Sequence, residues 1–171
     1  MKINYVIGDA TAPQGEGLKI IPHVCNDVGA WGAGFVLALS RRWKEPEEYY
    51  RAMEKYELGT IEAIPVEDDI IVVNMIGQSE TISTSNSNTP PVRYVSIDIA
   101  CNNIANIITG MKKDNSDKEI GIHCPFFGCG LAGGKWYLIK AILEENFIKR
   151  GIPVTVYGRT EEELNRITKG N

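Results

Sequence analysis

Residues 20–34 read IIPHVCNDVGAWGAG, an apolar and β-rich run that passes directly into a glycine cluster. The run lies in a predicted strand over 18–25, and residues 35–43 after the cluster have a helical composition. Glycines at a turn from strand to helix let backbone N–H groups approach an anion, and the helix that follows adds its positive end. The stretch therefore predicts an α/β unit with an anion-binding turn over 29–34.

A second glycine cluster follows another predicted strand and precedes another predicted helix. Residues 126–134 read FFGCGLAGG, and the part from Gly128 to Gly133 fits G-x-G-x-x-G, the pattern of a dinucleotide-binding turn. Arg159 and Glu161 lie at the spacing of a ribose contact, so this interpretation stays open. The chain after the turn is too short for the sheet that a dinucleotide-binding fold builds there. Two such turns in one small α/β domain favour a diphosphate-containing ligand between them.

The rest of the chain alternates predicted strands and helices. We expect strands over 2–8, 18–25, 60–66, 69–75, 119–127 and 153–157. We expect helices over 35–43, 46–56, 91–111 and 136–150, and a last helix that begins with a capping box formed by Thr160 and Glu163. The strands at 60–75 form a hairpin, and the polar stretch 77–90 is a long loop that either closes over a ligand or has no function. These elements predict a three-layer α/β/α fold with a central mixed sheet, in a single domain over residues 1–171.

Composition argues against several classes of protein. The chain has 18 basic and 22 acidic residues and a formal net charge of −4, whereas general nucleic-acid binders carry a basic excess. The four cysteines, Cys25, Cys101, Cys124 and Cys129, lack the spacing of a disulfide framework. No apolar run has the length of a signal peptide core or a membrane helix. We therefore expect a reduced, cytoplasmic protein with no membrane partner.

The two glycine stretches, preceded by Gly8-Asp9, resemble the macrodomain family over nearly the whole chain. The pattern H-x-C-N-x-x-G-x-W-G-x-G at 23–34 is the most specific part of this resemblance. Within the family, the chain is similar to the branch that holds the yeast-type ADP-ribose 1″-phosphate phosphatase and the terminal ADP-ribose protein glycohydrolase. The resemblance implies an α/β/α fold without a cofactor, and ADP-ribose or a derivative bound in a crevice between residues 29–34 and 128–134.

The resemblance also implies a role for individual positions. Asp9 matches the carboxylate that accepts a hydrogen bond from the adenine amino group, and Tyr157 matches an aromatic residue that packs on the adenine. Asn26 matches a residue that contacts the distal ribose. The two loops supply the other ligand contacts, which are Gly32, Ala33 and Gly34 beside that ribose, and Gly128, Cys129, Gly130, Leu131 and Ala132 around the diphosphate.

His23 and Asn26 are the candidate catalytic residues implied by the resemblance. Phosphate-releasing members of this branch use a histidine at the place of His23, which can act as nucleophile or as general acid, aided by a carboxylate. Asp27 is close in sequence, but adjacent side chains of a strand point to opposite faces, so the carboxylate is not placed. The alternative is a core histidine that donates a hydrogen bond to a backbone carbonyl.

Three functions stay open, and the sequence does not decide whether the chain is an enzyme. The leading hypothesis is a hydrolase that releases phosphate from ADP-ribose 1″-phosphate, and the alternative is a non-catalytic ADP-ribose reader. The third is removal of ADP-ribose from an ADP-ribosylated protein or DNA. The glycohydrolases of this branch use a lysine after the central hairpin and an aspartate in the second loop, whereas residues 75–80 lack lysine and the loop has Ala132. Neither Cys-x-x-Cys nor His-x-x-x-His is present, so we expect no metal site.

Overall fold

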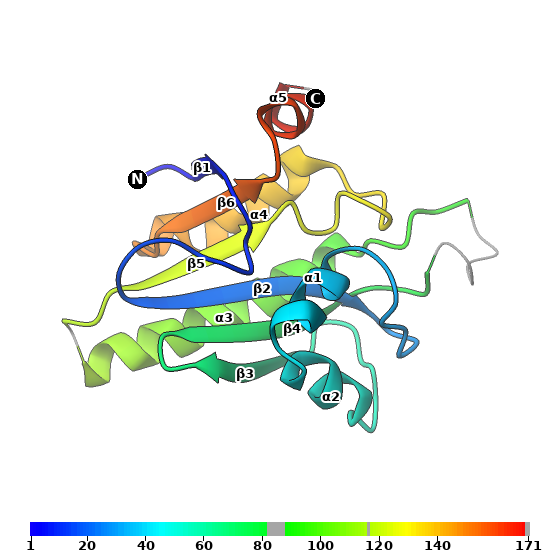
Figure 1. Cartoon of the computed structure of the whole chain (residues 1–171), viewed down its shortest axis with the longest axis horizontal. Helices are drawn as coiled ribbons and strands as arrows, with labels where there is room; N and C mark the ends of the chain where they lie inside the picture. Colours follow the sequence, from blue (N-terminus) through cyan, green and yellow to red (C-terminus); the bar gives the residue numbers. More distant parts are fainter. Residues whose placement is uncertain (82–87, 116, 170–171) are drawn as a thin grey trace.

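The computed structural model describes residues 1–81, 88–115 and 117–169. Within them, a six-stranded mixed sheet has the order β1-β6-β5-β2-β4-β3 (Figure 1). The strands are β1 (Asn4–Ile7), β2 (Leu18–Asn26), β3 (Ile61–Glu67), β4 (Ile70–Gln78), β5 (Ile120–Pro125) and β6 (Val154–Gly158). The helices are α1 (Phe35–Arg42), α2 (Glu45–Arg51), α3 (Tyr94–Asp114), α4 (Trp136–Asn146), the 3₁₀ turn η1 (Ile148–Arg150) and α5 (Glu161–Lys169).

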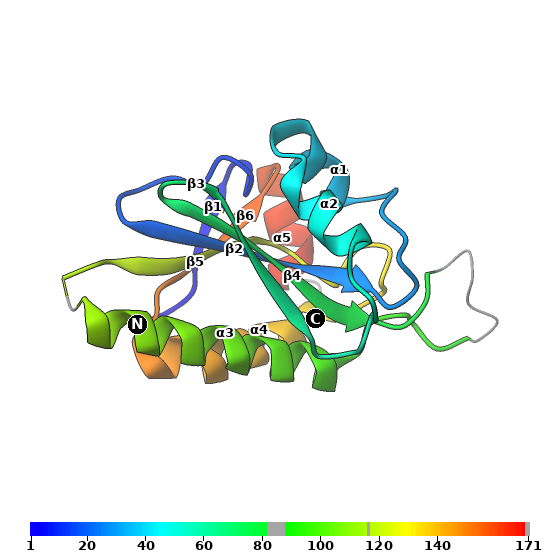
Figure 2. The same ribbon diagram turned by 90° about the horizontal axis from the view of Figure 1, so that it is seen from below.

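Helices cover both faces of the sheet. Figure 2 shows α3 and α4 against one face and α1 and α2 on the opposite face. A large buried cluster, including Ile104 of α3 and Leu143 of α4, fills the first interface. A smaller cluster, including Leu39 and Tyr50, fills the second. The helices α1 to α4 bury apolar residues against the two faces of the sheet, so the predicted three-layer α/β/α architecture is confirmed.

The pairing of the strands brings the two glycine clusters together at the carboxyl ends of the parallel strands. β1, β6, β5, β2 and β4 pair in parallel, and the predicted hairpin is the antiparallel pair β3–β4. The carboxyl ends of the parallel strands therefore point the same way, and the turns after β1, β2 and β5 meet there. The order differs from the 3-2-1-4-5-6 order of a dinucleotide-binding sheet, so that interpretation of the second glycine turn is wrong.

Four predicted helix details differ from the structure, and the first is that the helix predicted over 91–111 is α3 at Tyr94–Asp114. α2 ends at Arg51 instead of residue 56, and the chain that follows places the Tyr56 ring 4.9 Å from the fully buried Tyr50 ring. The helix predicted over 136–150 is α4 followed by the separate turn η1. Thr160 accepts the Glu163 N–H as expected, but the Glu163 carboxylate accepts from the Arg159 N–H, outside the predicted capping box.

Two findings concern the predicted environment of the protein. All four cysteines are free thiols. Among the described residues, no helix combines the length and apolar character needed to span a bilayer.

Part of the predicted loop over 77–90, residues 82–87, lies outside the described residues.

Candidate functional site

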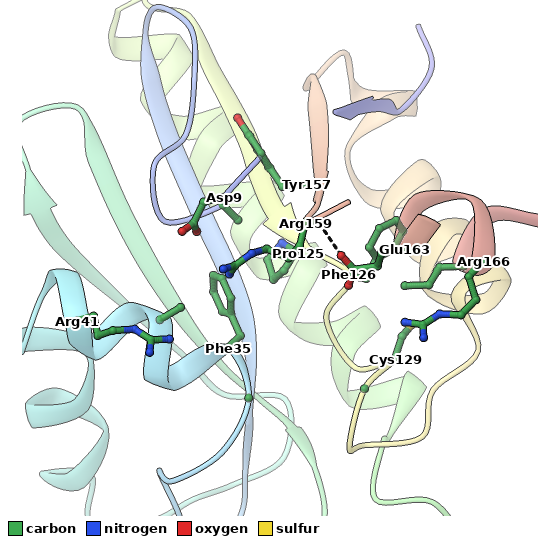
Figure 3. A pocket seen from close by; sticks show the side chains of 15 residues that line it. Asp9, Phe35, Arg41, Pro125, Phe126, Cys129, Tyr157, Arg159, Glu163 and Arg166 are labelled. Carbon is green, nitrogen blue, oxygen red and sulfur yellow. Dashed lines mark hydrogen bonds between the residues drawn. The ribbon is translucent and has the colours of Figure 1, made fainter. Parts of the chain in front are cut away.

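Three contiguous cavities form one crevice along the carboxyl ends of the parallel strands. The Asp9 cavity, about 280 Å³, lies near the β1–β6 end of the sheet (Figure 3). The central cavity, about 170 Å³, shares wall residues such as Phe35 with it, and shares residues such as Ala33 with the third. The third, the Asn26 cavity, has a volume of about 490 Å³. The crevice therefore extends past both glycine loops.

Asn26 holds the first glycine loop in shape. Its side-chain oxygen accepts hydrogen bonds from the N–H groups of Val28 at 3.1 Å and Ala30 at 3.0 Å, and its amide nitrogen donates to the Ala30 carbonyl at 2.7 Å. The buried Tyr50 hydroxyl also lies 2.8 Å from the Asn26 side-chain oxygen. Asn26 is 8% exposed and lines the cavity named after it. Its contacts therefore fix the loop that forms the wall of this cavity.

The second glycine loop closes on itself through its backbone. The Gly134 N–H donates to the Gly128 carbonyl at 2.7 Å, and the Gly133 N–H donates to the Gly130 carbonyl at 3.0 Å. A Cβ atom at Gly134 would lie 2.2 Å from the Gly128 carbonyl oxygen, so only glycine fits there. Leu131, at the tip, is 58% exposed. The predicted loop residues line the crevice on both sides, including Gly32, Gly34, Cys129 and Ala132.

Asp9 and Tyr157 lie in one cavity although they are far apart in the sequence. The Asp9 carboxylate accepts hydrogen bonds from the Thr11 N–H at 2.9 Å and the Thr11 hydroxyl at 2.8 Å. Burial raises the pKa of Asp9, but the Thr11 hydrogen bonds and the nearby charges of Arg159 and Arg42 outweigh it and leave this pKa below its usual value. Asp9 is therefore an anionic hydrogen-bond acceptor at neutral pH.

Hydrogen-bond contacts with His123 and Gln14 hold Tyr157 in place. The Tyr157 hydroxyl accepts the Gln14 N–H at 2.9 Å and lies 2.8 Å from Nδ1 of His123. Burial, with a smaller effect of the Lys19 charge, lowers the pKa of His123 to about 4. His123 is thus neutral at pH 7, and its Nδ1 can accept the Tyr157 O–H. This chain of contacts fixes both the ring and the loop that follows β1.

Several residues in the wall of the crevice were not expected from the sequence. Phe35, Phe126, Arg41 and Arg166 line the Asp9 cavity, together with Arg159, which was considered only for the dinucleotide interpretation. The two phenylalanines had a local signal, because each lies at the junction between a glycine loop and a regular element. The arginines had none, since isolated charges at helix ends usually face solvent.

His23 is deeply buried beside the central cavity. It is 1% exposed, and its Nε2 atom lies 2.5 Å from the side-chain oxygen of Asn74. The rings of Trp31 and Phe35 pack against it at centroid distances of 5.5 and 5.9 Å. Burial lowers the pKa of His23 to about 4, although the contact with Asn74 opposes this shift. The partner is thus a side-chain amide, in place of the backbone carbonyl expected of a core histidine.

The end of the crevice at the Asn26 cavity contains few groups for acid–base chemistry. Asp27 accepts the Glu80 N–H at 2.6 Å and so anchors the chain after β4. Burial, followed by the effect of the Glu62 charge, raises the pKa of Cys25 well above its usual value, so this residue is a neutral thiol. The described residues that line the Asn26 cavity carry no ionised side chain. No group of three or more potential metal ligands is found in the described parts of the chain.

The fold and the crevice define an α/β/α domain with a ligand site between two glycine loops. No family model matches the chain. A solved macrodomain protein from Streptomyces coelicolor is 41% identical, with a TM-score of 0.75 over 93% of this chain and 100% of that chain. A protein of unknown function from Bacteroides thetaiotaomicron is 44% identical, with a TM-score of 0.84 over 92% and 98%. The chain belongs to the macrodomain family.

A curated protein gives a more distant match. The ADP-ribose 1″-phosphate phosphatase of Lodderomyces elongisporus is 22% identical over 152 residues, which cover 85% of this chain and 92% of that protein. At this identity the match agrees with the family but assigns no reaction to the chain.

Proposed function

We propose that the chain binds ADP-ribose in the crevice between its two glycine loops. The continuity of the three cavities carries this proposal, because ADP-ribose is an elongated ligand of adenine, ribose, diphosphate and ribose. At one end, Asp9 offers an anionic acceptor for the adenine amino group, and the Tyr157 ring offers a packing surface. At the other end, the Asn26 cavity has room for a sugar and its substituent.

The middle of the crevice suits a diphosphate. Both glycine loops line the central cavity, and the first of them leads directly into α1. Backbone N–H groups in such turns, with the positive end of a helix, bind phosphate without a basic side chain. This explains how a chain with a net charge of −4 can bind an anionic ligand.

We propose release of phosphate from ADP-ribose 1″-phosphate as the activity to test first. The name of the curated relative supports this reaction, and the Asn26 cavity is the end at which the distal ribose would lie. His23 is the candidate catalytic residue, but a pKa of about 4 leaves about one molecule in a thousand protonated at pH 7. A general-acid role of His23 is therefore disfavoured. The packing of the His23 ring against Trp31 and Phe35 supports a positioning role instead.

The lining of the Asn26 cavity favours a second candidate, a non-catalytic ADP-ribose reader. Hydrolysis of a phosphate ester needs a nucleophile or a proton donor within hydrogen-bond reach of the reacting atoms. Among the described residues, this cavity offers amides, a hydroxyl and the neutral thiol of Cys25, and no carboxylate. A reader needs the same crevice and no such pair.

Titration calorimetry with ADP-ribose tests the binding proposal, and a phosphate-release assay with ADP-ribose 1″-phosphate separates the two candidates. An absence of heat at millimolar ligand would overturn ADP-ribose binding. Binding without phosphate release would support the reader, whereas release that persists in His23→Gln would support a phosphatase that uses another catalytic residue. Turnover of ADP-ribosylated protein or DNA in place of the phosphate ester would favour the third hypothesis.

A further inference from the structure

Three arginines surround the Asp9 cavity. Arg41 extends from α1 and Arg166 from α5 on opposite sides, and Arg159 extends between them from the turn after β6 (Figure 3). Among the described residues, none of these guanidinium groups has an ion-pair or hydrogen-bond partner. Exposed arginines are common, but three from separate elements that line one cavity form a local cluster of positive charge.

The carboxylates of the same cavity neutralise this cluster only in part, although the Asp9 carboxylate is close enough to Arg159 for the arginine charge to lower its pKa. In the part of the chain that the structure describes, its lining has two acidic residues, Asp9 and Glu163, against the three arginines, which leaves an excess of one positive charge. The Asp9 carboxylate is held by Thr11, and the Glu163 carboxylate accepts the backbone N–H of Arg159 at 2.5 Å. The cavity is thus locally basic in a chain whose net charge is −4.

The covalent order of ADP-ribose identifies the part of the ligand that faces the arginines. The Asp9 cavity holds the proposed adenine contacts at Asp9 and Tyr157, and also Cys129 and Gly130 of the loop proposed for the diphosphate. The group that joins adenine to the diphosphate is the adenosine ribose, so that sugar would lie in this cavity. Its hydroxyl groups are uncharged, so this sugar by itself offers the guanidinium groups no anion.

We infer that this cavity recognises a phosphate group on the adenosine ribose, which makes ADP-ribose phosphorylated at that sugar the preferred class of ligand. The inference rests on the proposed function, because it uses the orientation of ADP-ribose in the crevice. Guanidinium groups match phosphate oxygens with paired, charge-assisted hydrogen bonds. Backbone N–H groups of the glycine loops serve the diphosphate, and the arginines serve the additional phosphate.

Calorimetry with ADP-ribose and with ADP-ribose 2′-phosphate on the full chain tests this inference. We expect the phosphorylated ligand to bind at least about tenfold more tightly at low salt, as one charge-assisted contact predicts. The ratio of the two dissociation constants should fall several-fold in Arg159→Gln and in Arg166→Gln. The matched control is Arg150→Gln, because Arg150 contacts Asn102 and Asn106 of α3, outside the crevice lining, and the ratio should stay at the wild-type value.

The outcomes separate this inference from the proposed function. Equal affinity for the two ligands would overturn the inference and leave ADP-ribose binding intact. A decrease of the affinity for both ligands by the same factor in the Arg159 and Arg166 variants would also overturn the inference, because the arginines would then serve the diphosphate. An absence of binding by either ligand would overturn the proposed function itself.

Discussion

Replacement of His23 by glutamine should flatten the pH dependence of stability on the acidic side of neutrality. In the folded chain the pKa of His23 is about 4, whereas an exposed histidine has a pKa of 6.5. Between these values the unfolded chain binds a proton that the folded chain excludes, so stability falls as the pH falls. One pH unit corresponds to about 1.4 kcal/mol, which makes the loss by pH 4 about 3 kcal/mol. Because His23 is only 1% exposed, little of this effect is screened by solvent.

Urea unfolding followed by tryptophan fluorescence at several pH values measures this effect. Glutamine keeps an amide donor for Asn74 but does not titrate, so the slope of its unfolding free energy against pH should be smaller by up to about 1.4 kcal/mol per unit. The slope is compared, so a lower stability of the variant at pH 7 does not disturb the test. His123→Gln, at a less buried site, should show a smaller change. Parallel curves for wild type and His23→Gln would refute the reasoning and restore His23 as a proton donor near neutral pH.

Substitutions at Asn26, at two loop glycines and at Tyr157 test the loops and the Asp9 cavity. Asn26→Ala removes the acceptor of two loop N–H groups. It should lower the unfolding free energy, measured by urea unfolding, by about 2–3 kcal/mol. A loss below about 1 kcal/mol would contradict the role of Asn26 in the loop. Gly134→Ala should lower the unfolding free energy by more than about 2 kcal/mol in the same assay, because its Cβ would clash with the Gly128 carbonyl oxygen. A Cβ at Gly130 would have nothing within 4 Å, so Gly130→Ala should change the unfolding free energy by less than about 0.5 kcal/mol. Equal effects of the two would contradict this account. Tyr157→Phe should lower stability by about 1–2 kcal/mol, and Tyr157→Ala should in addition weaken ADP-ribose binding more than about tenfold by calorimetry. Unchanged affinity in Tyr157→Ala would exclude its packing on adenine.

The elements of the fold could be predicted from the sequence where the signal is local. Hydrophobic periodicity and glycine turns predicted the six strands seen in the described residues, and the β3–β4 hairpin, to within a few residues. The early end of α2 could not be predicted, because the local composition stays compatible with a helix up to Tyr56, whereas the chain turns after Arg51 and packs the Tyr56 ring against Tyr50. The strand order likewise follows from pairings between distant segments, which no short pattern specifies.

The same limit applies to the crevice. Its glycine loops had a direct sequence signal, because a turn that approaches an anion needs residues without a Cβ. The Asn74 partner of His23 and the Arg166 side of the Asp9 cavity had none, because each comes from a strand or helix remote in sequence. The resemblance supplied positions for ligand contacts but gave no information on the burial of His23, which decides its protonation.

The parallel pairing of β1 with β6 has a kinetic consequence. Asp9 follows the first strand and Tyr157 belongs to the last, so the Asp9 cavity needs contacts between segments separated by most of the sequence. During translation, the Asn26 loop can form beside β2 and β4 long before β6 leaves the ribosome. Pairing of strands as far apart in sequence as β1 and β6 is slow. Because β1 is an edge strand, this pairing is also among the first to open in local unfolding. Under the proposed function, recognition of adenosine would therefore be the last property gained in folding and the first lost under stress.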